Sequence, residues 1–379
     1  MPHKKILLLY ISEVSGHHQA TLAIEHALKQ LEPNAEVLNI NAFRQTTPIS
    51  EKIINQVYLK VIKRTPQIWK YLYDNPSFIK NTSQIKRIIH KFNSPKLKAI
   101  VDKFQPDCIV CTQAYPCGMI ADCKKTYGLK TPLIGVLTDY APHSFWIYDE
   151  IDYYIVPAEE VKERFVQKGV DAKKIINFGI PINAKFTESK NKNHIAYKYG
   201  LDINKPIVLI MGGGQGIGPI KKMVKYIDKL GQDEQVIVIC GINKRLVKRL
   251  RRLAIKSPKK IIVLEYVHNI DELMEIASII VTKPGGLTTA EALAKGLPFI
   301  IVHPIPGQEA ANAAFLVKKG VGVKIEDIKD FPAAVNELLA NREKLTQMSF
   351  QARQISKPKA AIDIASLILR LCSSISYTG

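Results

Sequence analysis

A cluster of glycines lies directly after the apolar run 207–211 and before a helical pattern. The stretch reads MGGGQGIGP over 211–219, and its glycines are Gly212, Gly213, Gly214, Gly216 and Gly218. Glycine lets a backbone turn tightly and approach a ligand, and the N-terminus of the next helix offers free N–H groups to a diphosphate. No acidic residue stands where the dinucleotide fingerprint needs one. The cluster therefore predicts a phosphate-binding loop and not a dinucleotide site.

A second glycine turn, TKPGGLTTAEAL over 282–293, follows another apolar run. Thr288 and Thr289 fall at the expected start of a helix, where threonine hydroxyls either bind phosphate or act only as N-caps. Glu291 falls in the first turns of the same helix. Its carboxylate can accept two hydrogen bonds from a ribose diol, or only complement the positive end of the helix dipole. The turn predicts a second contact to a nucleotide.

The loop PGQEAANA over 306–313 opens one more helix and carries Gln308 and Glu309 at its start. The carboxyl ends of parallel strands meet at one edge of a sheet, so we expect this loop beside the two glycine turns. An amide next to a carboxylate suits sugar hydroxyls, which need both donors and acceptors. The three stretches together predict a nucleotide-sugar site.

Two stretches of the first half carry groups that can move a proton. SGHHQA over 15–20 contains His17 and TDYAPHSFW over 138–146 contains Asp139, each close behind an apolar run. A carboxylate or an imidazole can take the proton of an acceptor hydroxyl during group transfer. The alternatives are a turn cap for Asp139 and an ordinary loop histidine for His17, since the helical pattern after this loop is expected to run from about Ala20 to Leu31. No Asp-x-Asp metal motif stands near these residues.

An alternation of apolar runs and helical patterns predicts the elements that position these groups. Apolar runs typical of buried parallel strands recur over 5–11, 35–40, 107–112, 132–138, 153–156, 207–211, 235–240 and 260–264. This alternation is typical of a doubly wound α/β fold. We expect two Rossmann-like domains, over 1–190 and 200–355, with the polar stretch 188–206 at their boundary. Within 356–379, a final helix over about 359–372 presents one apolar face for packing on the first domain.

The charge balance of the 379 residues is strongly basic, with 54 basic and 34 acidic side chains and a net charge of +20. Nucleic acid, anionic lipid and phosphorylated substrates all suit such a surface. The helical pattern over about 50–103 mixes lysines with aromatics, which fits either a membrane interface or core aromatics with a solvated lysine face. Lys244–Lys260 contains nine basic and no acidic residues. Because no RNA or DNA motif accompanies it, nucleic acid is not the expected partner.

The cysteines admit a metal interpretation that we do not favour. Cys108 and Cys111 form a CxxC pair, followed by Cys117 and Cys123. The first two lie inside an apolar run, where cysteine is commonly a small hydrophobe, so no metal site is expected. Six irregularly spaced cysteines fit a reducing cytosol. No apolar run approaches the roughly 18 residues that span a bilayer, so we expect any membrane contact to be peripheral.

These motifs in this order resemble one glycosyltransferase family. MGGGQGIGP, TKPGGLTTAEAL and PGQEAANA, with SGHHQA, PNAEV (33–37) and TDYAPHSFW in the first half, are similar to motifs of family 28 glycosyltransferases. The family contains monogalactosyldiacylglycerol synthase, the bacterial processive diacylglycerol glucosyltransferases and, more distantly, the lipid II-forming N-acetylglucosaminyltransferase. The resemblance covers most of the chain. It implies the α/β GT-B fold, two Rossmann-like domains facing across a cleft, with inversion at the anomeric carbon and no required metal.

The resemblance also implies roles for individual residues. The donor contacts would be Gly212, Gly213, Gly214, Gly216, Thr288, Glu291, Gln308 and Glu309. Asp139 would be the catalytic base, with His17 on the acceptor side as the other candidate for that role. Further acceptor or head-group contacts would be Gly16, His143 and Trp146.

The implied reaction moves glucose or galactose from UDP-glucose or UDP-galactose to diacylglycerol, with the UDP-sugar as co-substrate and no other cofactor. The resemblance implies a cytoplasmic enzyme bound peripherally to the anionic inner face of the cell membrane. The loop EVSGHH carries fewer glycines than many relatives have there. A polyprenyl-linked or other lipid acceptor therefore stays open as the alternative.

Overall fold

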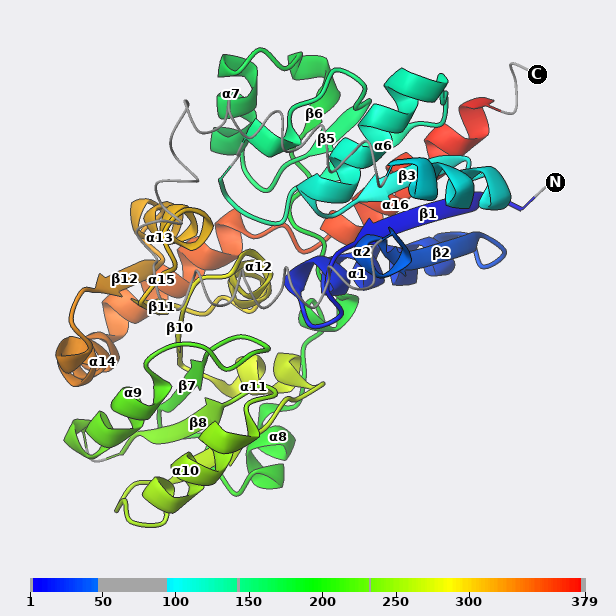
Figure 1. Ribbon diagram of the computed structural model, residues 1–379. Coiled ribbons are helices and arrows are strands. Elements are labelled where there is room, and N and C mark those ends of the chain that lie inside the picture. The colour runs from blue at the N-terminus through cyan, green and yellow to red at the C-terminus, as the bar shows by residue number, and fades with distance from the viewer. Residues whose placement is uncertain (1–2, 47–93, 142–143, 232, 376–379) are drawn as a thin grey trace. The chain divides into compact units, whose positions relative to one another are not determined.

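The computed structural model describes residues 3–46, 94–141, 144–231 and 233–375, drawn in colour in Figure 1. The chain divides into two compact units. The first unit holds Met1–Ala184 and Lys357–Gly379, with the short piece Pro306–Gln308, and the second holds Lys185–Ile305 and Glu309–Ser356. The divisions thus fall at Ala184 and Ser356, where the sequence predicted about 190–200 and 355.

The first unit is built on a six-stranded parallel sheet in the order β2-β1-β3-β4-β5-β6. Its strands are β1 (Lys5–Tyr10), β2 (Glu36–Asn41), β3 (Cys108–Cys111), β4 (Leu133–Val136), β5 (Tyr153–Ile155) and β6 (Ile175–Ile176). Its helices are α1 (Gly16–Leu31), α2 (Ala42–Thr46), a helix over 94–104, α6 (Ala114–Tyr127), η1 (Ser144–Trp146), α7 (Glu159–Gln167), η2 (Ala172–Lys174) and α16 (Ala360–Ile375). The predicted aromatic segment 50–103 lies largely outside the described residues.

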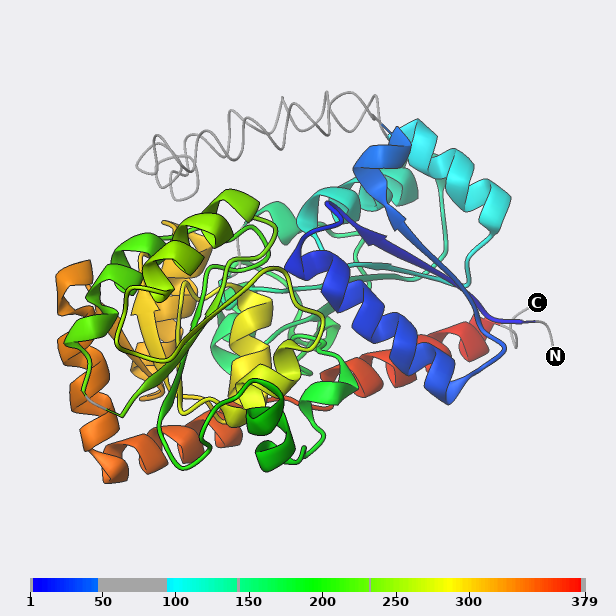
Figure 2. The same cartoon turned by 90° about the horizontal axis from the view of Figure 1, so that it is seen from below.

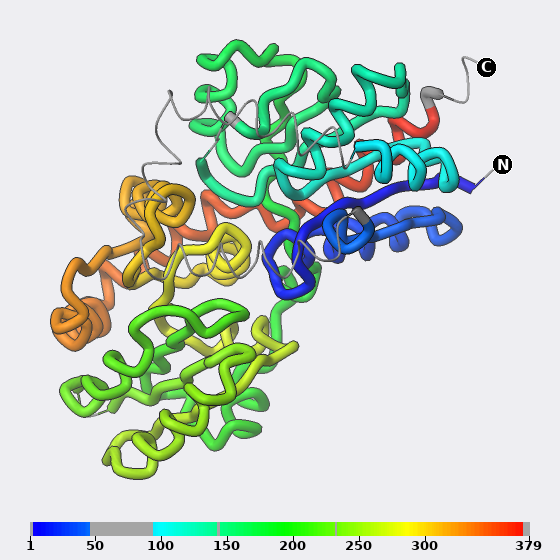
Figure 3. Tube along the Cα trace, in the orientation of Figure 1, coloured from blue at the N-terminus to red at the C-terminus, as the bar shows by residue number. Residues whose placement is uncertain are grey.

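The C-terminal helix α16 packs into the core of the first unit. Its apolar face places Ile364 and Ile368, both fully buried, in one cluster with Ile6 and Leu8 of β1. Figures 2 and 3 show α16, in red, running alongside α1, in blue. Complete burial of an isoleucine or leucine side chain stabilises a fold by about 1.5–3 kcal/mol. The last helix therefore closes the sheet face that the first helix begins to cover.

The cysteines of β3 behave as small apolar residues. Cys108 and Cys111 are fully buried free thiols, as the apolar run around them predicts. Burial raises the pKa of both thiols well above its usual range, so they are uncharged and held by packing. In the described residues, no three histidine, cysteine, aspartate or glutamate side chains gather as a metal site would require.

The second unit repeats the plan with a parallel sheet in the order β12-β11-β10-β7-β8-β9. Its strands are β7 (Ile207–Met211), β8 (Gln235–Ile239), β9 (Ile261–Leu264), β10 (Ile279–Thr282), β11 (Phe299–Val302) and β12 (Gly322–Ile325). Its helices are α8 (Lys192–Lys198), α9 (Ile220–Tyr226), η4 (Ile227–Lys229), α10 (Lys244–Ala254), α11 (Ile270–Ile276), α12 (Gly286–Ala294), α13 (Gln308–Lys318), η5 (Ile328–Asp330), α14 (Phe331–Ala340) and α15 (Arg342–Ile355), with η3 (Ala184–Phe186) at the junction of the units.

The expected pair of doubly wound α/β units is thus present. The predicted strands agree with the observed ones to within one or two residues at most ends, because most of them are short, largely apolar runs between polar turns. Among the described residues, no helix is both long and apolar enough to span a bilayer.

Candidate active site

Each sheet has one place where its strand order reverses. In the first unit the chain passes from β1 to its neighbour β2 and then returns to β3 on the other side of β1. In the second unit the same reversal falls between β7 and β10. Open parallel sheets bind ligands outside the carboxyl ends of the strands at such points. Functional groups are therefore expected on the loops that follow β1 and β3 in the first unit and β7 and β10 in the second.

The loop after β1 is tightly folded and starts α1 earlier than its sequence predicts. Ser12 adopts a left-handed φ of 68°, which turns the chain out of the strand. The hydroxyl of Ser15 lies 2.7 Å from the carbonyl oxygen of Ser12 and accepts a hydrogen bond from the backbone N–H of His18. Ser15 is thus the N-cap, and α1 begins at Gly16 and not near residue 20. The predicted loop residue His17 lies in the first helical turn.

The ring of His17 connects the loop after β1 to the ends of β3 and β4. Its Nδ1 atom lies 2.9 Å from the carbonyl oxygen of Thr112 and 2.8 Å from Oγ1 of Thr138. A carbonyl oxygen only accepts hydrogen bonds, so Nδ1 carries the hydrogen. Burial lowers the pKa of His17, and the hydrogen bond to Thr112 opposes this only in part. The ring is therefore neutral near pH 7, with a lone pair on Nε2.

Asp139 follows Thr138 directly, so the two residues predicted to handle a proton lie at the same edge of the first sheet. The side chain of Asp139 is half-buried. Burial raises the pKa of the neighbouring Tyr140 hydroxyl, and the charge of Asp139 adds to the effect. Tyr140 is therefore a neutral phenol near pH 7.

The other acceptor residues are placed less favourably. The indole of Trp146 is 4% exposed and packs over Gly135 of β4, where an added Cβ would lie 3.4 Å from the ring. As it stands, the ring contributes to the core and offers a ligand little surface. Gly16 is the first residue of α1. His143 lies outside the described residues.

The glycine loop after β7 requires glycine at two positions for steric reasons. A Cβ on Gly212 would lie 2.5 Å from the carbonyl oxygen of Ile217, and one on Gly216 would lie 2.0 Å from that of Cys240. Gly216 also has a left-handed φ of 60°. The loop is therefore folded back on itself, in the geometry that lets backbone amides approach an anion.

Lys283, the first residue after β10, lies against this loop. A Cβ on Gly213 would be 3.7 Å from Cε of Lys283, so the lysine stem runs next to the glycine turn across the switch point. Its ammonium group forms an ion pair with Glu309 on α13. The other carboxylate oxygen of Glu309 accepts a hydrogen bond from the backbone N–H of Ile305 at 2.9 Å. The three loops after β7, β10 and β11 are thus joined through one lysine and one glutamate.

The helix α12 presents the predicted phosphate and ribose contacts. Its N-cap is Gly285. The alternative that Thr288 and Thr289 serve only as N-caps is therefore wrong. Thr289 is fully buried, whereas Thr288 is only half-buried. Burial raises the pKa of Glu291 to about 8. The charge of Lys185 lowers this pKa and the charge of Asp271 raises it, both by less than burial does. Without ligand, Glu291 is therefore protonated at neutral pH.

The sequence reasoning missed three residues that shape this region. Lys283 and Asn312 stand inside the quoted motifs, and the buried amide of Asn312 donates to the carbonyl oxygen of Pro284 at 2.9 Å. Their positions inside the motifs TKPGG and QEAANA could have indicated that these two residues belong to the site. Asp271 is 2% exposed and pairs with Lys185 and Lys190 at 3.1 and 2.8 Å. This last network joins residues some 80 positions apart, and no local motif marks it.

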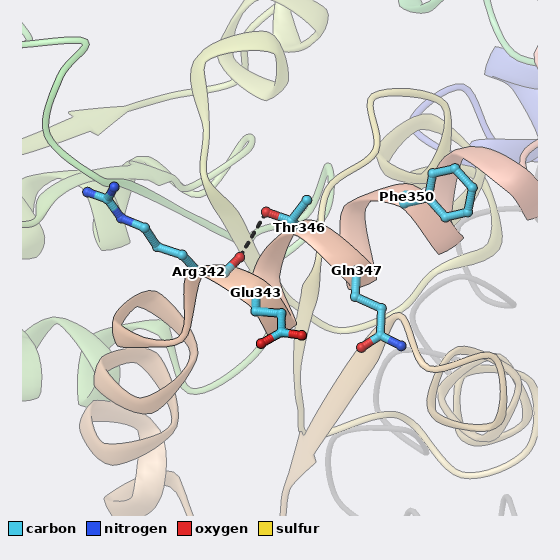
Figure 4. A pocket seen from close by; sticks show the side chains of 5 residues that line it. All are labelled: Arg342, Glu343, Thr346, Gln347 and Phe350. Atoms are coloured by element: carbon cyan, nitrogen blue, oxygen red, sulfur yellow. Dashed lines mark hydrogen bonds between the residues drawn. The ribbon is translucent and has the colours of Figure 1, made fainter.

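A surface hollow of the second unit lies away from these residues. Figure 4 shows its lining, Arg342, Glu343, Thr346, Gln347 and Phe350, which all come from α15. Residues spaced by one and four along a single helix form a shallow outer face and not an enclosed pocket. None of the predicted site residues lines it. The hollow carries no argument about the activity.

Comparison with known proteins decides the family. A family model described as monogalactosyldiacylglycerol (MGDG) synthase matches residues 17–182, and one described as the glycosyltransferase family 28 C-terminal domain matches residues 207–365. A processive diacylglycerol beta-glucosyltransferase of Bacillus cereus is 34% identical over 366 residues, which cover 96% of this chain and 93% of that protein. The chain belongs to the diacylglycerol glucosyltransferase family. The resemblance read from the motifs is thereby confirmed, and the chain is a glycosyltransferase.

Solved structures agree on the fold of this family member. MurG of Acinetobacter baumannii superposes with a TM-score of 0.64 at 17% identity, covering 97% of this chain and 99% of that one. MnaA of S. aureus, solved with UDP, gives a TM-score of 0.63 at 16% identity, with 97% of both chains covered. At such identities the likeness shows the fold alone, and it confirms the expected GT-B class.

Proposed function

We propose that this chain transfers a hexose from a UDP-sugar to the hydroxyl of diacylglycerol, with inversion at the anomeric carbon. The observation that carries the donor half is the position of Lys283, whose ammonium stem lies beside the glycine turn after β7 at the switch point of the second sheet. A fixed cation beside backbone amides at such a point suits a diphosphate. The Bacillus cereus relative bears the name of a diacylglycerol enzyme, and the S. aureus neighbour was solved with UDP.

In the proposed donor complex, the turn at Gly212–Gly216 and Lys283 hold the diphosphate, with the hydroxyl of Thr288 as a further donor to it. Glu291 contacts the ribose diol, and Gln308 contacts hydroxyls of the hexose. Glu309 fixes Lys283 and the loop end at Ile305, which orients Gln308 one residue away. The positive charge that meets the leaving diphosphate comes from the protein, so we propose that no metal is required.

In the proposed reaction, the acceptor oxygen attacks C1 of the hexose while the bond from C1 to the β-phosphate oxygen breaks. UDP leaves with that electron pair, and the acceptor proton passes to a base. We assign this base to Nε2 of His17, because the Nδ1 hydrogen bond to Thr112 and the lowered pKa fix the neutral tautomer with its lone pair on Nε2. Asp139 is the alternative base, next to Thr138 at the same edge.

Radiolabelled UDP-glucose and UDP-galactose, each incubated with diacylglycerol in neutral detergent micelles, test this proposal. We expect a labelled lipid product with diacylglycerol and no label transfer to a polyprenyl-linked sugar acceptor, with activity unchanged by EDTA. His17→Ala should lower kcat by about 10²–10⁴-fold. Full activity in His17→Ala together with its loss in Asp139→Asn would move the base to Asp139. Labelling of only the polyprenyl-linked acceptor would overturn the proposed substrate.

A proposed peripheral location at an anionic membrane completes this function, because diacylglycerol is insoluble in water. A separate arm of the same experiment replaces micelles with vesicles that contain diacylglycerol and about 30% anionic lipid. Activity that rises with the anionic fraction supports the location, and activity independent of it contradicts it.

A further inference from the structure

The helix α10 carries the most concentrated charge of the second unit. Six of its eleven residues are basic, and Lys256, Lys259 and Lys260 follow within six positions of its end. Figure 1 places α10 beside β8 in the second unit, where it covers the sheet next to β9 and α9. Its inner face is held by Val247 and Leu250, which are buried in the core of that unit. The fold therefore needs only the apolar face of α10, and the charges are directed outward.

Few of these charges are neutralised by neighbours. Arg251 lies 3.8 Å from Glu265, and Lys259 lies 3.4 Å from Glu234. Within the described part of the chain, the other seven basic side chains of this face have no acidic partner within salt-bridge distance, namely Lys244, Arg245, Lys248, Arg249, Arg252, Lys256 and Lys260. All seven are exposed. Mutual repulsion makes such a face costly unless an external polyanion neutralises it.

An isoleucine lies at the C-terminal end of the same helix. Ile255, the C-cap of α10, is 84% exposed. It lies four positions after Arg251 and seven after Lys248, so the three side chains line one side of the helix. An isoleucine there gains nothing from a phosphate backbone of nucleic acid. At a bilayer surface it can enter the interfacial region while its basic neighbours stay at the head groups.

We propose that α10 and the turn after it, over 244–260, form a docking surface of the second unit for an anionic lipid bilayer. The basic side chains meet anionic head groups, and Ile255 inserts among them. Clusters of four or more basic residues on a helix bind anionic head groups, and an apolar side chain on the same exposed face adds interfacial insertion. The proposal rests on the proposed function only in that a diacylglycerol acceptor lies in a membrane.

Sedimentation with vesicles of neutral lipid, with and without about 30% phosphatidylglycerol, tests the surface. The test variant carries Lys244→Gln, Lys248→Gln, Arg252→Gln and Lys256→Gln. The control variant removes the same charge at exposed positions elsewhere, with Lys125→Gln, Lys192→Gln, Lys318→Gln and Lys329→Gln. Each basic residue close to an anionic surface contributes about fivefold to binding. We expect the test variant to lose more than about tenfold in affinity for the anionic vesicles and the control to lose about threefold or less.

A second variant separates insertion from charge. Ile255→Ser should weaken vesicle binding several-fold at 0.5 M salt, where the charges are screened, and Ile255→Leu should preserve it. Equal losses in the test and control variants, or undiminished binding of Ile255→Ser, would overturn the proposal. So would tighter α10-dependent binding to a duplex or single-stranded oligonucleotide than to vesicles. All variants should keep the transferase activity of the wild type in neutral micelles. If the wild-type protein itself shows no such activity, the proposed function fails and not the docking surface.

Discussion

The ammonium group of Lys283 pairs with the carboxylate of Glu309, two residues that lie 26 positions apart and follow neighbouring strands β10 and β11. Both side chains are largely buried, with 18% and 11% of their surface exposed. Their pairing leaves Lys283 beside the glycine turn after β7. One contact therefore stabilises the second unit and holds a cation where we propose that a diphosphate binds.

Substitution at Lys283 separates these two roles. Lys283→Met leaves the Glu309 carboxylate without its cation and should lower the free energy of unfolding by about 2 kcal/mol. The double variant Lys283→Met, Glu309→Gln removes both charges and should recover most of that loss. Neither variant should recover affinity for UDP, which we expect to fall by more than about tenfold in both. Denaturant unfolding and UDP titration calorimetry measure the two quantities, and restored UDP binding in the double variant would contradict the phosphate role.

The glycine turn provides a steric prediction. Gly216→Ala places a methyl group against the carbonyl of Cys240 at a left-handed φ, so the free energy of unfolding should fall by more than about 2 kcal/mol. Gly285, at the start of α12, has a φ of −65° and open space around its Cβ position. Gly285→Ala should therefore leave stability within about 0.5 kcal/mol. If the donor phosphates approach the turn at Gly285, the added methyl group should raise the KM for the UDP-sugar in Gly285→Ala although stability is kept. An unchanged KM would mean that the phosphates bind elsewhere.

The environment of His17 predicts the pH dependence of the reaction. Since burial lowers its pKa, the neutral form that acts as base persists as the pH falls through 6.5, the usual value. The acid limb of the plot of kcat against pH should therefore lie below pH 6.5. His18 offers a matched control, because its ring stacks on Tyr10 and bonds to the carbonyl of Glu13. We expect His18→Ala to keep kcat within about threefold and the same acid limb. An acid limb above pH 7 would disagree with this assignment.

Glu291 predicts a dependence of stability on pH in the opposite sense to most carboxylates. Its pKa of about 8 lies above the unfolded value of 4.5, so the folded chain binds the proton more tightly. Stability should therefore decline as the pH rises from about 4.5 to 8. Glu291→Gln, which mimics the protonated form, should be more stable than wild type by on the order of 2 kcal/mol at pH 8. At pH 4 the two should unfold alike, and thermal melts at the two values measure the difference.

The positions of these groups were predictable from sequence only where local patterns carry the information. Wholly apolar runs such as Ile207–Met211 specify buried parallel strands, and glycines after them specify turns, so the two sheets and their loops follow from the chain. The helix α1 starts earlier than expected because its cap, Ser15, is one residue in a polar loop where several could serve.

The chemical state of the site residues lay beyond the sequence. That Nδ1 of His17 carries the hydrogen depends on Thr112, 95 positions away, and the burial of Glu291 depends on elements around α12 that no motif includes. The ion pair of Lys283 was missed for the same reason, since a lysine in a turn is usually solvated. Sequence motifs thus located the candidate site, whereas its protonation and its internal partners arise from packing between distant segments.

The network around Asp271 links the start of the second unit to the Glu291 carboxyl. Asp271, on α11, is buried and holds Lys185 and Lys190 of the segment that enters this unit. Burial opposes the ionisation of Asp271, but hydrogen bonds from the two lysines outweigh it and lower its pKa. Its hydrogen bond likewise raises the pKa of Lys190. The network therefore stabilises the fold above about pH 4 and below about pH 10.5, and loses this contribution beyond either limit.

Asp271→Asn should consequently lower the free energy of unfolding at pH 7 by about 3 kcal/mol, with the difference from wild type shrinking below pH 4. The neighbouring pair of Lys198 and Glu272, 2.9 Å apart and more exposed, is the control, and Lys198→Met should cost less than about 1 kcal/mol. Loss of the Asp271 charge also removes a group that raises the pKa of Glu291 and leaves Lys185, which lowers it. Ionisation of Glu291 should therefore lower the stability of Asp271→Asn at a lower pH than it does in wild type. A decline at unchanged pH would mean that the two carboxyl groups act independently.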